Sequence, residues 1–414
     1  MAVSVPTSIT LLGTQVAASA TGAAAVSFNE VNMDAQAIAT AFVALAPAHG
    51  AFTGQQAVPG VQEVLAIAYS GSTLELLTAS SPTGQPCCST VQVIRRGPRS
   101  RFGRPQTLVT NAGGGTTGRL VPLSNGRMLA VIGGPQRLWA SEAQGSGRFG
   151  AVRGLTRPGF PPAALAVTGT TGGGSTVAWT QGSAQTVMTA SAGPGGTPSR
   201  RHTVLTLAPG HAISGLQLAA RPDGLTMAWT ESWSDAAGAY HSQANAADVV
   251  GHAQLTRPRA LSAPADVASA LALSGDANGA EVAAWDVCAP SSQACIIQST
   301  SRPGEPPVPA AHSRHKAKKR VRARWFGADS GLGPIDPGVS PELATSLAGK
   351  SVIGWISRSR VVLATMRGGR SGGARRVSGG LAENLAVGFG PGGEAVATWS
   401  QETVAPRVYV SVLR

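Results

Sequence analysis

A short apolar segment that ends in tryptophan and then turns polar recurs along the chain. The clearest copies are residues 174–181, 225–231, 281–286, 352–357 and 395–401. With looser copies included, the spacing is about 50 residues, a period typical of four-stranded propeller blades. Such units stack on one another because a single unit cannot bury its own apolar face. The repeat therefore predicts an all-β fold built from similar units.

Each unit is predicted to contain four strands. A small-residue apolar strand comes first, and a turn such as 124–126 or 222–224 leads into the tryptophan-ended strand. Glycine and asparagine tolerate the positive φ of tight hairpins, so these turns predict antiparallel pairing. A third, alternating strand and a looser fourth strand complete the unit. The predicted second strands are 23–30, 73–80, 127–132, 176–181, 225–231, 281–287, 351–356 and 394–400.

We count eight such units in the 414 residues, and the atypical second unit leaves seven as the alternative. The eighth unit has no fourth strand, whereas residues 3–11 form a spare strand ahead of the first unit. If the spare strand completes the eighth unit, the ring closes and loses an exposed edge. The expected fold is one β-propeller domain over residues 1–414, with about eight four-stranded blades, closed by the N-terminal strand.

Composition and charge support a folded chain with one unusual segment. Charged residues make up 13% of the sequence and hydrophobic residues 43%, which argues against global disorder. The formal net charge is +13. Seven basic residues fall between positions 314 and 324, and without them the charge is +6. The basic character is therefore largely local.

The basic run lies in a predicted insertion of the sixth unit, residues 301–337, which begins rich in proline. We expect a disordered surface loop, or alternatively a segment that docks an anionic surface through counterion release. No aromatic residue is interleaved with the run, so a nucleic-acid partner is not indicated. The candidates for binding an anionic partner are Lys316, Lys318, Lys319, Arg320, Arg322 and Arg324.

The four cysteines fall into two local pairs. Short, even spacing is compatible with disulfides in an oxidising compartment, and we predict a bridge between Cys288 and Cys295. For Cys87 and Cys88, both a vicinal bridge and two free thiols stay open. Neither pair has the spacing of zinc ligands.

The sequence predicts no membrane span, because no stretch approaches 18 uninterrupted apolar residues. Residues 1–13 also lack the positive n-region and apolar h-region of a signal peptide. Either export does not use that route, or the sequence begins downstream of a leader. We expect a secreted or envelope protein, with a cytoplasmic one as the alternative.

The tryptophans that end the second strands have two interpretations. Identical placement in unit after unit is what packing between blades requires; alternatively they form a face on which sugars stack. Trp233 breaks this register and is predicted to lie in a loop beside Glu231 and Asp235. It is therefore a candidate ligand-binding residue, together with Gln181 and Gln401, which follow strand-ending tryptophans.

Acidic residues take the same strand-end position in three units: Glu30, Glu231 and Asp286. If all second strands run the same way, these acids gather at one end of the ring. They are candidates for an acid/base pair or a cation site, and the alternative is that they satisfy turns. The seven histidines show no metal-ligand spacing. No phosphate or dinucleotide motif stands in a plausible context, so we predict neither a metal nor a cofactor.

The Ala-Trp-Thr and Ala-Trp-Asp strand ends at 178–180 and 284–286 follow glycine-containing turns. They resemble the uncharacterised, alanine- and glycine-rich β-propeller proteins exported by high-GC Gram-positive bacteria. A fainter similarity is to sialidase-type propellers, whose Asp-box is not met at 274–279. A WD-repeat assignment fails because Trp285-Asp286 is the only such dipeptide. The resemblance implies a secreted or envelope propeller with no assigned activity.

These observations lead us to expect a monomeric, non-enzymatic binding or scaffold propeller outside the cytoplasm. Its ligand would be a carbohydrate, a wall polymer or another protein. The alternative is a propeller glycan hydrolase or lyase that uses acids at the channel mouth. An enzyme should bring several acids and an aromatic residue into one central pocket, whereas a scaffold should line its channel with alanine, serine and threonine.

Overall fold

A computed structural model gives the fold of most of the chain. The described residues are 2–4, 9–32, 38–48, 50–81, 89–123, 126–144, 147–251, 254–264, 266–276, 278–289, 294–304, 326–327, 330–346, 349–367, 370–389, 393–401 and 406–413. The predictions made for Cys87 and Cys88 fall outside these residues. Those made for the basic run also fall outside them: Lys316, Lys318, Lys319, Arg320, Arg322 and Arg324.

The described residues form thirty-three β-strands and no helix, which confirms the all-β prediction. Units 1 to 4 contain, in chain order, β2 Ile9–Ala18, β3 Ala24–Asn32, β4 Ile38–Ala46 and β5 Gln56–Ala57; β6 Glu63–Ser70, β7 Thr73–Ser80, β8 Thr90–Arg96 and β9 Gln106–Val109; β10 Thr117–Pro122, β11 Met128–Gly133, β12 Leu138–Ala143 and β13 Arg153–Gly154; and β14 Leu165–Gly169, β15 Ser175–Gln181, β16 Thr186–Ala192 and β17 Arg200–Thr206.

Units 5 to 8 contain β18 Ala212–Arg221, β19 Gly224–Ser234, β20 Tyr240–Val250, β21 Gln254–Leu255 and β22 Arg259–Ala260; β23 Val267–Gly275, β24 Glu281–Cys288, β25 Cys295–Arg302 and β26 Ser330–Ile335; β27 Glu342–Thr345, β28 Lys350–Ser357, β29 Arg360–Arg367 and β30 Arg370–Arg376; and β31 Glu383–Phe389, β32 Ala395–Gln401, β33 Arg407–Leu413 and β1 Ala2–Ser4. The first two strands of each unit meet in a turn with a positive-φ glycine, such as Gly71 at +59° and Gly126 at +70°. These turns explain why short apolar segments pair locally.

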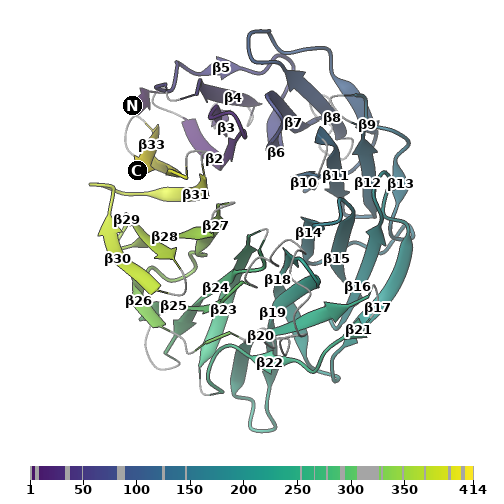
Figure 1. The fold of residues 1–414 in the computed structure, drawn as a ribbon, viewed down its shortest axis with the longest axis vertical. Helices are drawn as coiled ribbons and strands as arrows, with labels where there is room; N and C mark the ends of the chain where they lie inside the picture. Colours follow the sequence, from purple (N-terminus) through teal and green to yellow (C-terminus); the bar gives the residue numbers. More distant parts are fainter. Residues whose placement is uncertain are drawn as a thin grey trace, which may run out of the picture.

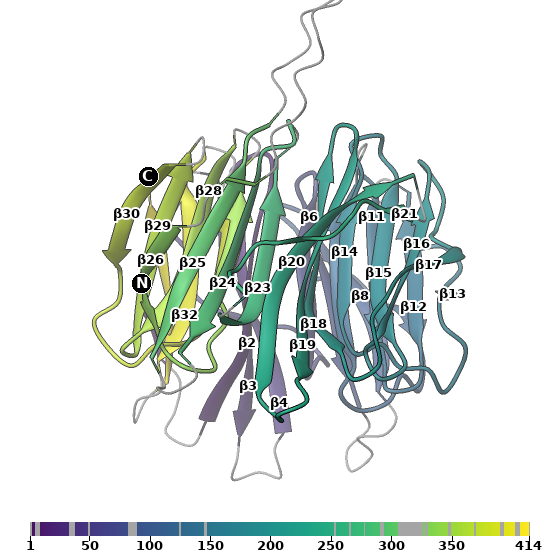
Figure 2. The ribbon, with the colours of Figure 1, turned by 90° about the horizontal axis from the view of Figure 1, so that it is seen from below.

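The units follow one another round a ring, with their first strands innermost and their last strands at the outer rim (Figures 1 and 2). In the described residues, six sheets have four strands and a seventh has nine. The larger sheet arises because a parallel bridge between Ser242 and Val267 joins units 5 and 6. Sheets of four antiparallel strands in this arrangement are consistent with propeller blades.

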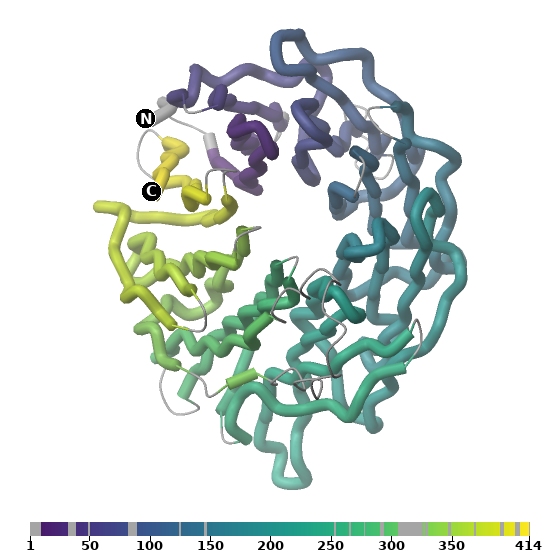
Figure 3. The backbone as a smooth tube through the Cα atoms, viewed as in Figure 1, coloured from purple at the N-terminus to yellow at the C-terminus, as the bar shows by residue number. Residues whose placement is uncertain are grey.

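The two ends of the chain meet in unit 8 (Figure 3). β1 pairs antiparallel with β33, with Ala2 opposite Tyr409 and Ser4 opposite Arg407. The N-terminal segment thus supplies the outermost strand of this unit. The predicted strand 3–11 is divided, however, because Ile9 already begins β2.

The predicted insertion 301–337 is strand at both ends. β25 continues to Arg302, and β26 pairs with it as the fourth strand of unit 6. The long connection therefore lies between the third and fourth strands, and it is shorter than predicted because backbone pairing extends into both of its ends.

The apolar core lies between neighbouring units. Trp179 of unit 4 shares a cluster with Leu129 and Val131 of unit 3, and Trp355 of unit 7 shares one with Ile297 of unit 6. The strand-ending tryptophans are at most 4% exposed: Trp179, Trp229, Trp285, Trp355 and Trp399. Their burial confirms the packing interpretation, and these residues do not form a ligand face.

β-Bulges shape the innermost strands. Register shifts occur at the same place in units 1, 5, 6 and 8. In unit 1 the bulge aims Gln15, whose Nε2 donates to the carbonyl oxygen of Leu65 in unit 2 at 3.0 Å. In unit 5, Gln217 donates to the carbonyl oxygen of Leu271 in unit 6 at 3.2 Å. A bulge re-aims a side chain in this way, and here it ties adjacent inner strands together.

Candidate functional site

A cavity of about 590 Å³ lies among the innermost strands, at the centre of the ring. Residues from β2, β10, β18, β23, β27 and β31 line it, and most of their side chains are small or aliphatic. Two lining residues are charged, Arg119 on β10 and Glu342 on β27. Units 3 and 7, which supply them, lie far apart round the ring (Figure 1). Opposite charges therefore face this cavity from separate units.

A second cavity, of about 550 Å³, adjoins the first and shares Thr14, Ser340, Glu342 and Leu385 with it. It includes the β28–β29 turn, so it opens at the end of the ring where the second strands finish. Asp336 also lines it, but both of its carboxylate oxygens accept backbone N–H groups. The donors are Arg358 at 2.5 Å and Ser359 at 2.6 Å. Asp336 thus holds the turn in place.

Glu342 is the acid common to both cavities. Desolvation by burial raises its pKa to about 7, and the Coulomb attraction of Arg119 opposes this effect without cancelling it. Part of the surface of Glu342 is accessible to solvent through the cavity. Protein nevertheless surrounds the carboxyl group, which is why desolvation dominates its pKa. Near neutral pH, Glu342 is therefore able to accept or donate a hydrogen bond through its carboxyl group.

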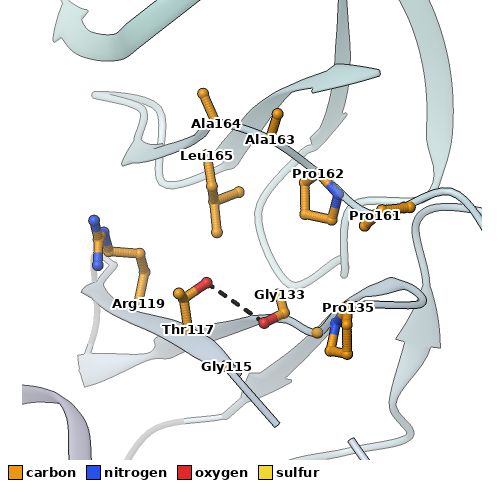
Figure 4. Close-up of a pocket in the computed structure, with 11 residues that line it drawn as sticks. Gly115, Thr117, Arg119, Gly133, Pro135, Pro161, Pro162, Ala163, Ala164 and Leu165 are labelled. Carbon is orange, nitrogen blue, oxygen red and sulfur yellow. Dashed lines mark hydrogen bonds between the residues drawn. The ribbon is translucent and has the colours of Figure 1, made fainter. Parts of the chain in front are cut away.

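A smaller cavity, of about 280 Å³, lies between units 3 and 4 and also reaches Arg119. Pro135, Pro161 and Pro162 form one side of it, and Figure 4 shows Arg119 on the opposite side. Thr117 Oγ1 donates to the carbonyl oxygen of Gly133 at 3.4 Å. This recess, with prolines on one side and a guanidinium group on the other, lies beside the central cavity.

Unit 5 carries a group of stacked rings at the same end of the ring. Trp233 lies in β19 and pairs with His241 of β20, so the predicted loop position is wrong. The hairpin continues because Asp235 closes its turn, accepting the backbone N–H groups of Ala237 and Ala239 at 2.9 Å. The second strand therefore runs three residues beyond Glu231.

Trp233 stacks on two imidazoles. The ring centroids of His211 and Trp233 are 5.2 Å apart, and those of Trp233 and His241 are 5.3 Å apart. His211 precedes β18 and His241 lies on β20, strands that flank β19 on opposite sides. The imidazoles therefore cover both faces of the indole. A sugar ring has no free indole face on which to stack, and only the edges of the three rings remain for a ligand.

Each imidazole of this group contacts a carboxylate. His211 Nδ1 is 2.7 Å from Glu231 Oε1, and His241 Nε2 is 2.8 Å from Asp235 Oδ2. The hydrogen bond from His241, together with those from the Ala239 and Ala237 amides, lowers the pKa of Asp235. The four side chains are 20–40% exposed. The group thus presents two carboxylate–imidazole pairs to solvent.

The remaining predicted site residues lie in separate units. Glu30, at the end of β3, is partly buried, which raises its pKa. Asp286 is 3% exposed, and Ser269 Oγ lies 2.8 Å from each of its carboxylate oxygens and donates to them. Gln181 and Gln401 end β15 and β32 and are partly exposed. None of these residues lines the cavities described above.

Cys288 and Cys295 form a disulfide, as predicted. The bridge joins β24 and β25 at directly opposed positions. In the described residues, Asp286 and these two cysteines are the one group close enough to suggest metal ligands. The sulfur atoms are bonded to each other, so they are not available as thiolate ligands.

Sequence reasoning missed Arg119 and Glu342. Both stand in short inner strands that are otherwise small or aliphatic, and a charge in such a strand is the signal that could have singled them out. Their common cavity depends on how units 3 and 7 are placed across the ring. That placement has no local signature in the sequence.

The comparisons with known proteins reveal the fold. No protein-family model matches the chain, and a comparison with curated proteins gives no match. A solved structure of an ulvan lyase, bound to the saccharide -[GlcA(1-4)Rha3S]-, has a TM-score of 0.52 at 8% sequence identity. The alignment covers 86% of this chain and 94% of the lyase. This chain is similar to that propeller protein in fold.

Two further structures complete the comparison. A second ulvan lyase structure has a TM-score of 0.50 at 7% identity, covering 99% of this chain and 96% of the lyase. The Hadza microbial sialidase Hz136 has a TM-score of 0.41 at 12% identity, over 90% and 79% of the two chains. At 7–8% identity, the likeness to the two ulvan lyase structures reveals the fold and carries no activity. The resemblance to exported proteins of high-GC Gram-positive bacteria stays a prediction.

Proposed function

We propose that the eight units are the blades of one closed propeller over residues 1–414. The pairing of β1 with β33 supports this, because it joins the two ends of the chain within unit 8. The packing of β2 against β31 brings units 1 and 8 together as well. In unit 8, β1 covers the outer edge of β33, which would otherwise be exposed.

We propose that this propeller is a non-enzymatic, extracytoplasmic protein that binds a carbohydrate. The central cavity of about 590 Å³ carries the proposal. Its small side chains leave room for sugar rings, Glu342 is suited to bond a hydroxyl group, and Arg119 is suited to an anionic substituent. The adjoining cavity holds three acids, Asp336, Glu342 and Glu383. No aromatic residue lines either cavity in the described part of the chain, and because an enzyme's pocket was expected to combine acids with an aromatic residue, this favours a binding role.

Two observations support the location and the ligand class. The Cys288–Cys295 disulfide is typical of an oxidising compartment outside the cytoplasm. The ulvan lyase similar in fold was solved with a bound saccharide, which is consistent with a carbohydrate ligand here. In the described residues, no helix has both the length and the apolar character needed to cross a membrane.

The alternative function is a glycan hydrolase or lyase, and one observation favours it. Glu342, with a pKa of about 7, lines the central cavity together with the cation Arg119, an arrangement suited to proton transfer at neutral pH. The earlier candidates Glu30, Glu231 and Asp286 stay proposals for this role. The hydrogen-bond partners of Glu231 and Asp286, which are His211 and Ser269, belong to the same units as these acids.

A glycan and wall-polymer array, run with Arg119→Gln, Glu342→Gln and wild-type protein, tests the proposal. We expect salt-resistant binding by the wild type, at least tenfold weaker binding by the channel variants, and no change in glycan length. Arg360→Gln, an exposed site outside the cavity, is the matched control. Shortened or unsaturated products that vanish in Glu342→Gln would replace the binding proposal with the enzymatic one.

The basic run outside the described residues keeps its proposed role in docking an anionic surface. Deleting residues 313–324 should abolish any salt-sensitive part of the array signal, and an unchanged signal would contradict that role. A protein partner and a monomeric state also stay proposals, and light scattering of the purified chain tests the latter.

A further inference from the structure

The outer rim of the ring carries arginine without acidic residues. Five stretches contain rim strands β9, β13, β17, β21 with β22, and β30: residues 96–109, 147–164, 193–210, 254–264 and 367–381. Together they hold fifteen arginines and no aspartate or glutamate. An even spread of the 20 acids would place about four there. Fourteen of the fifteen arginines are exposed, and we call these fourteen the arginine belt.

The arginine belt covers only part of the circumference. It spans units 2 to 5 and unit 7, whereas β26 of unit 6 contains no charged residue. In unit 1, the stretch 47–62 around rim strand β5 has no lysine, arginine, aspartate or glutamate. Of the described acids, some are buried on inner or middle strands, such as Glu75 and Glu281, and others lie in turns between strands, such as Asp223. The five rim stretches themselves therefore carry positive charge only.

Two rim strands show how the belt is presented. Every residue of β30 is exposed, including Arg370, Arg375 and Arg376. On β17, Arg200 and Arg201 are adjacent and exposed. Neighbouring residues of a strand point to opposite faces, so the guanidinium groups extend to both sides of the rim. Each presents a planar fork of donors that matches a carboxylate, sulfate or phosphate group.

We propose that the arginine belt is a docking surface for an acidic polysaccharide, whose anionic groups it binds by charge complementarity. A linear polymer with charges at regular intervals can follow the rim from one unit to the next. This site goes beyond the proposed carbohydrate site because it lies at the outer rim, away from the central cavity.

The structure favours a polysaccharide over a nucleic acid. Single-stranded nucleic acids need aromatic platforms for their bases. Of the three aromatic residues in the five stretches, Phe149 is buried and Phe102 lies under the guanidinium of Arg96 at 5.8 Å. Phe160 is the one aromatic residue in these stretches that is largely exposed, at 45%. The disulfide also favours an oxidising compartment outside the cytoplasm, which is consistent with a polysaccharide partner.

Charged rim strands have a second effect, because they prevent edge-to-edge association of sheets. The test must separate that effect from binding. Two belt variants remove two charges each, Arg375→Gln/Arg376→Gln in unit 7 and Arg200→Gln/Arg201→Gln in unit 4. The control, Arg358→Gln/Arg360→Gln, removes the same charge from the β28–β29 hairpin, where both residues are exposed.

Binding to heparin and to polygalacturonate is measured by fluorescence titration over a series of salt concentrations, with dextran as the uncharged probe. We expect tight binding to both polyanions and none to dextran. Each belt variant should weaken binding at least threefold at low salt, and the slope of log K against log[salt] should fall by about 1 to 2. The control should change affinity less than twofold.

Three results would overturn the proposal. Equal losses in the belt and control variants would show that net charge alone matters. Unchanged affinity combined with new oligomers in light scattering would show that the belt only protects the edges. Tighter binding to DNA than to either polysaccharide would show that the partner class is wrong. Arg119→Gln should leave rim binding intact, so failure of the channel proposal remains distinguishable.

Discussion

Replacing Glu281 by glutamine should change how the stability of the protein depends on pH. Its side chain, on β24, is fully buried. Oε2 accepts a hydrogen bond from Thr226 Oγ1 at 2.9 Å and lies 3.7 Å from Arg302 Nη1, while Oε1 has no hydrogen-bond partner in the described part of the chain. Desolvation dominates over the favourable Thr226, Arg302 and Arg221 interactions and raises the pKa of Glu281 to about 7.

The sign follows from comparing the folded and unfolded chains. The ordinary pKa is 4.5, so the folded state binds this proton more tightly than the unfolded state does. The stability that Glu281 contributes is therefore fully present below about pH 4.5 and is lost as the pH rises through about 7. A shift of this size corresponds to about 3 kcal/mol. Glutamine does not titrate, so the variant escapes this loss.

The free energy of unfolding is measured by urea denaturation at pH 4.5, 6 and 8, for wild type and Glu281→Gln. We expect the difference, wild type minus variant, to fall by about 3 kcal/mol between the lowest and highest pH. Gln254→Ala, at an exposed position where neither residue titrates, serves as the control, and its difference from wild type should not change with pH. A difference that stays constant within about 0.5 kcal/mol over this range would refute the reasoning.

Three further changes test the packing between and within units. Trp229→Ala should cost about 3–5 kcal/mol of unfolding free energy in urea, because Trp229 is 1% exposed; a loss below about 1 kcal/mol would contradict its packing role. Gly215→Ala should cost about 1–2 kcal/mol, since φ is +59° and the new Cβ would lie 3.2 Å from Thr230 Oγ1, whereas Gly54→Ala, with open space, should be nearly neutral. Cys295→Ser should lower stability by roughly 2 kcal/mol, and reducing the wild type should match it; wild type unaffected by reductant would argue against the bridge.

The second strands were the best-predicted part of the fold. β7 begins and ends where the sequence placed it, at Thr73–Ser80, and most others agree within two residues. The signal is strong because both faces of these strands are buried, so they read as continuous apolar runs between glycine turns. β19 departs from the prediction, because cross-strand pairing of polar and aromatic residues extends it to Ser234.

The candidate site was predicted only in part. Polar residues were expected to gather at the end of the ring where the second strands finish, and this expectation named Glu231 and Trp233. Both residues contact His211 there. Their partners were invisible in the sequence, since His211 and His241 come from strands whose register sets the stack. A register shift of one residue would have turned Trp233 to the other face.

Local chemistry settled the repeat, the turns and the Cys288–Cys295 bridge, because each depends on residues close together in the sequence. The burial of the tryptophans between units was predicted from their recurrence at one place in the repeat. Tertiary structure alone decided that Arg119 and Glu342 face one cavity, and that arginines scattered from position 99 to position 376 share one rim. Both arrangements join residues of different units. They arise from the curvature of the ring, and curvature is set by the packing between units, which no single stretch of sequence encodes.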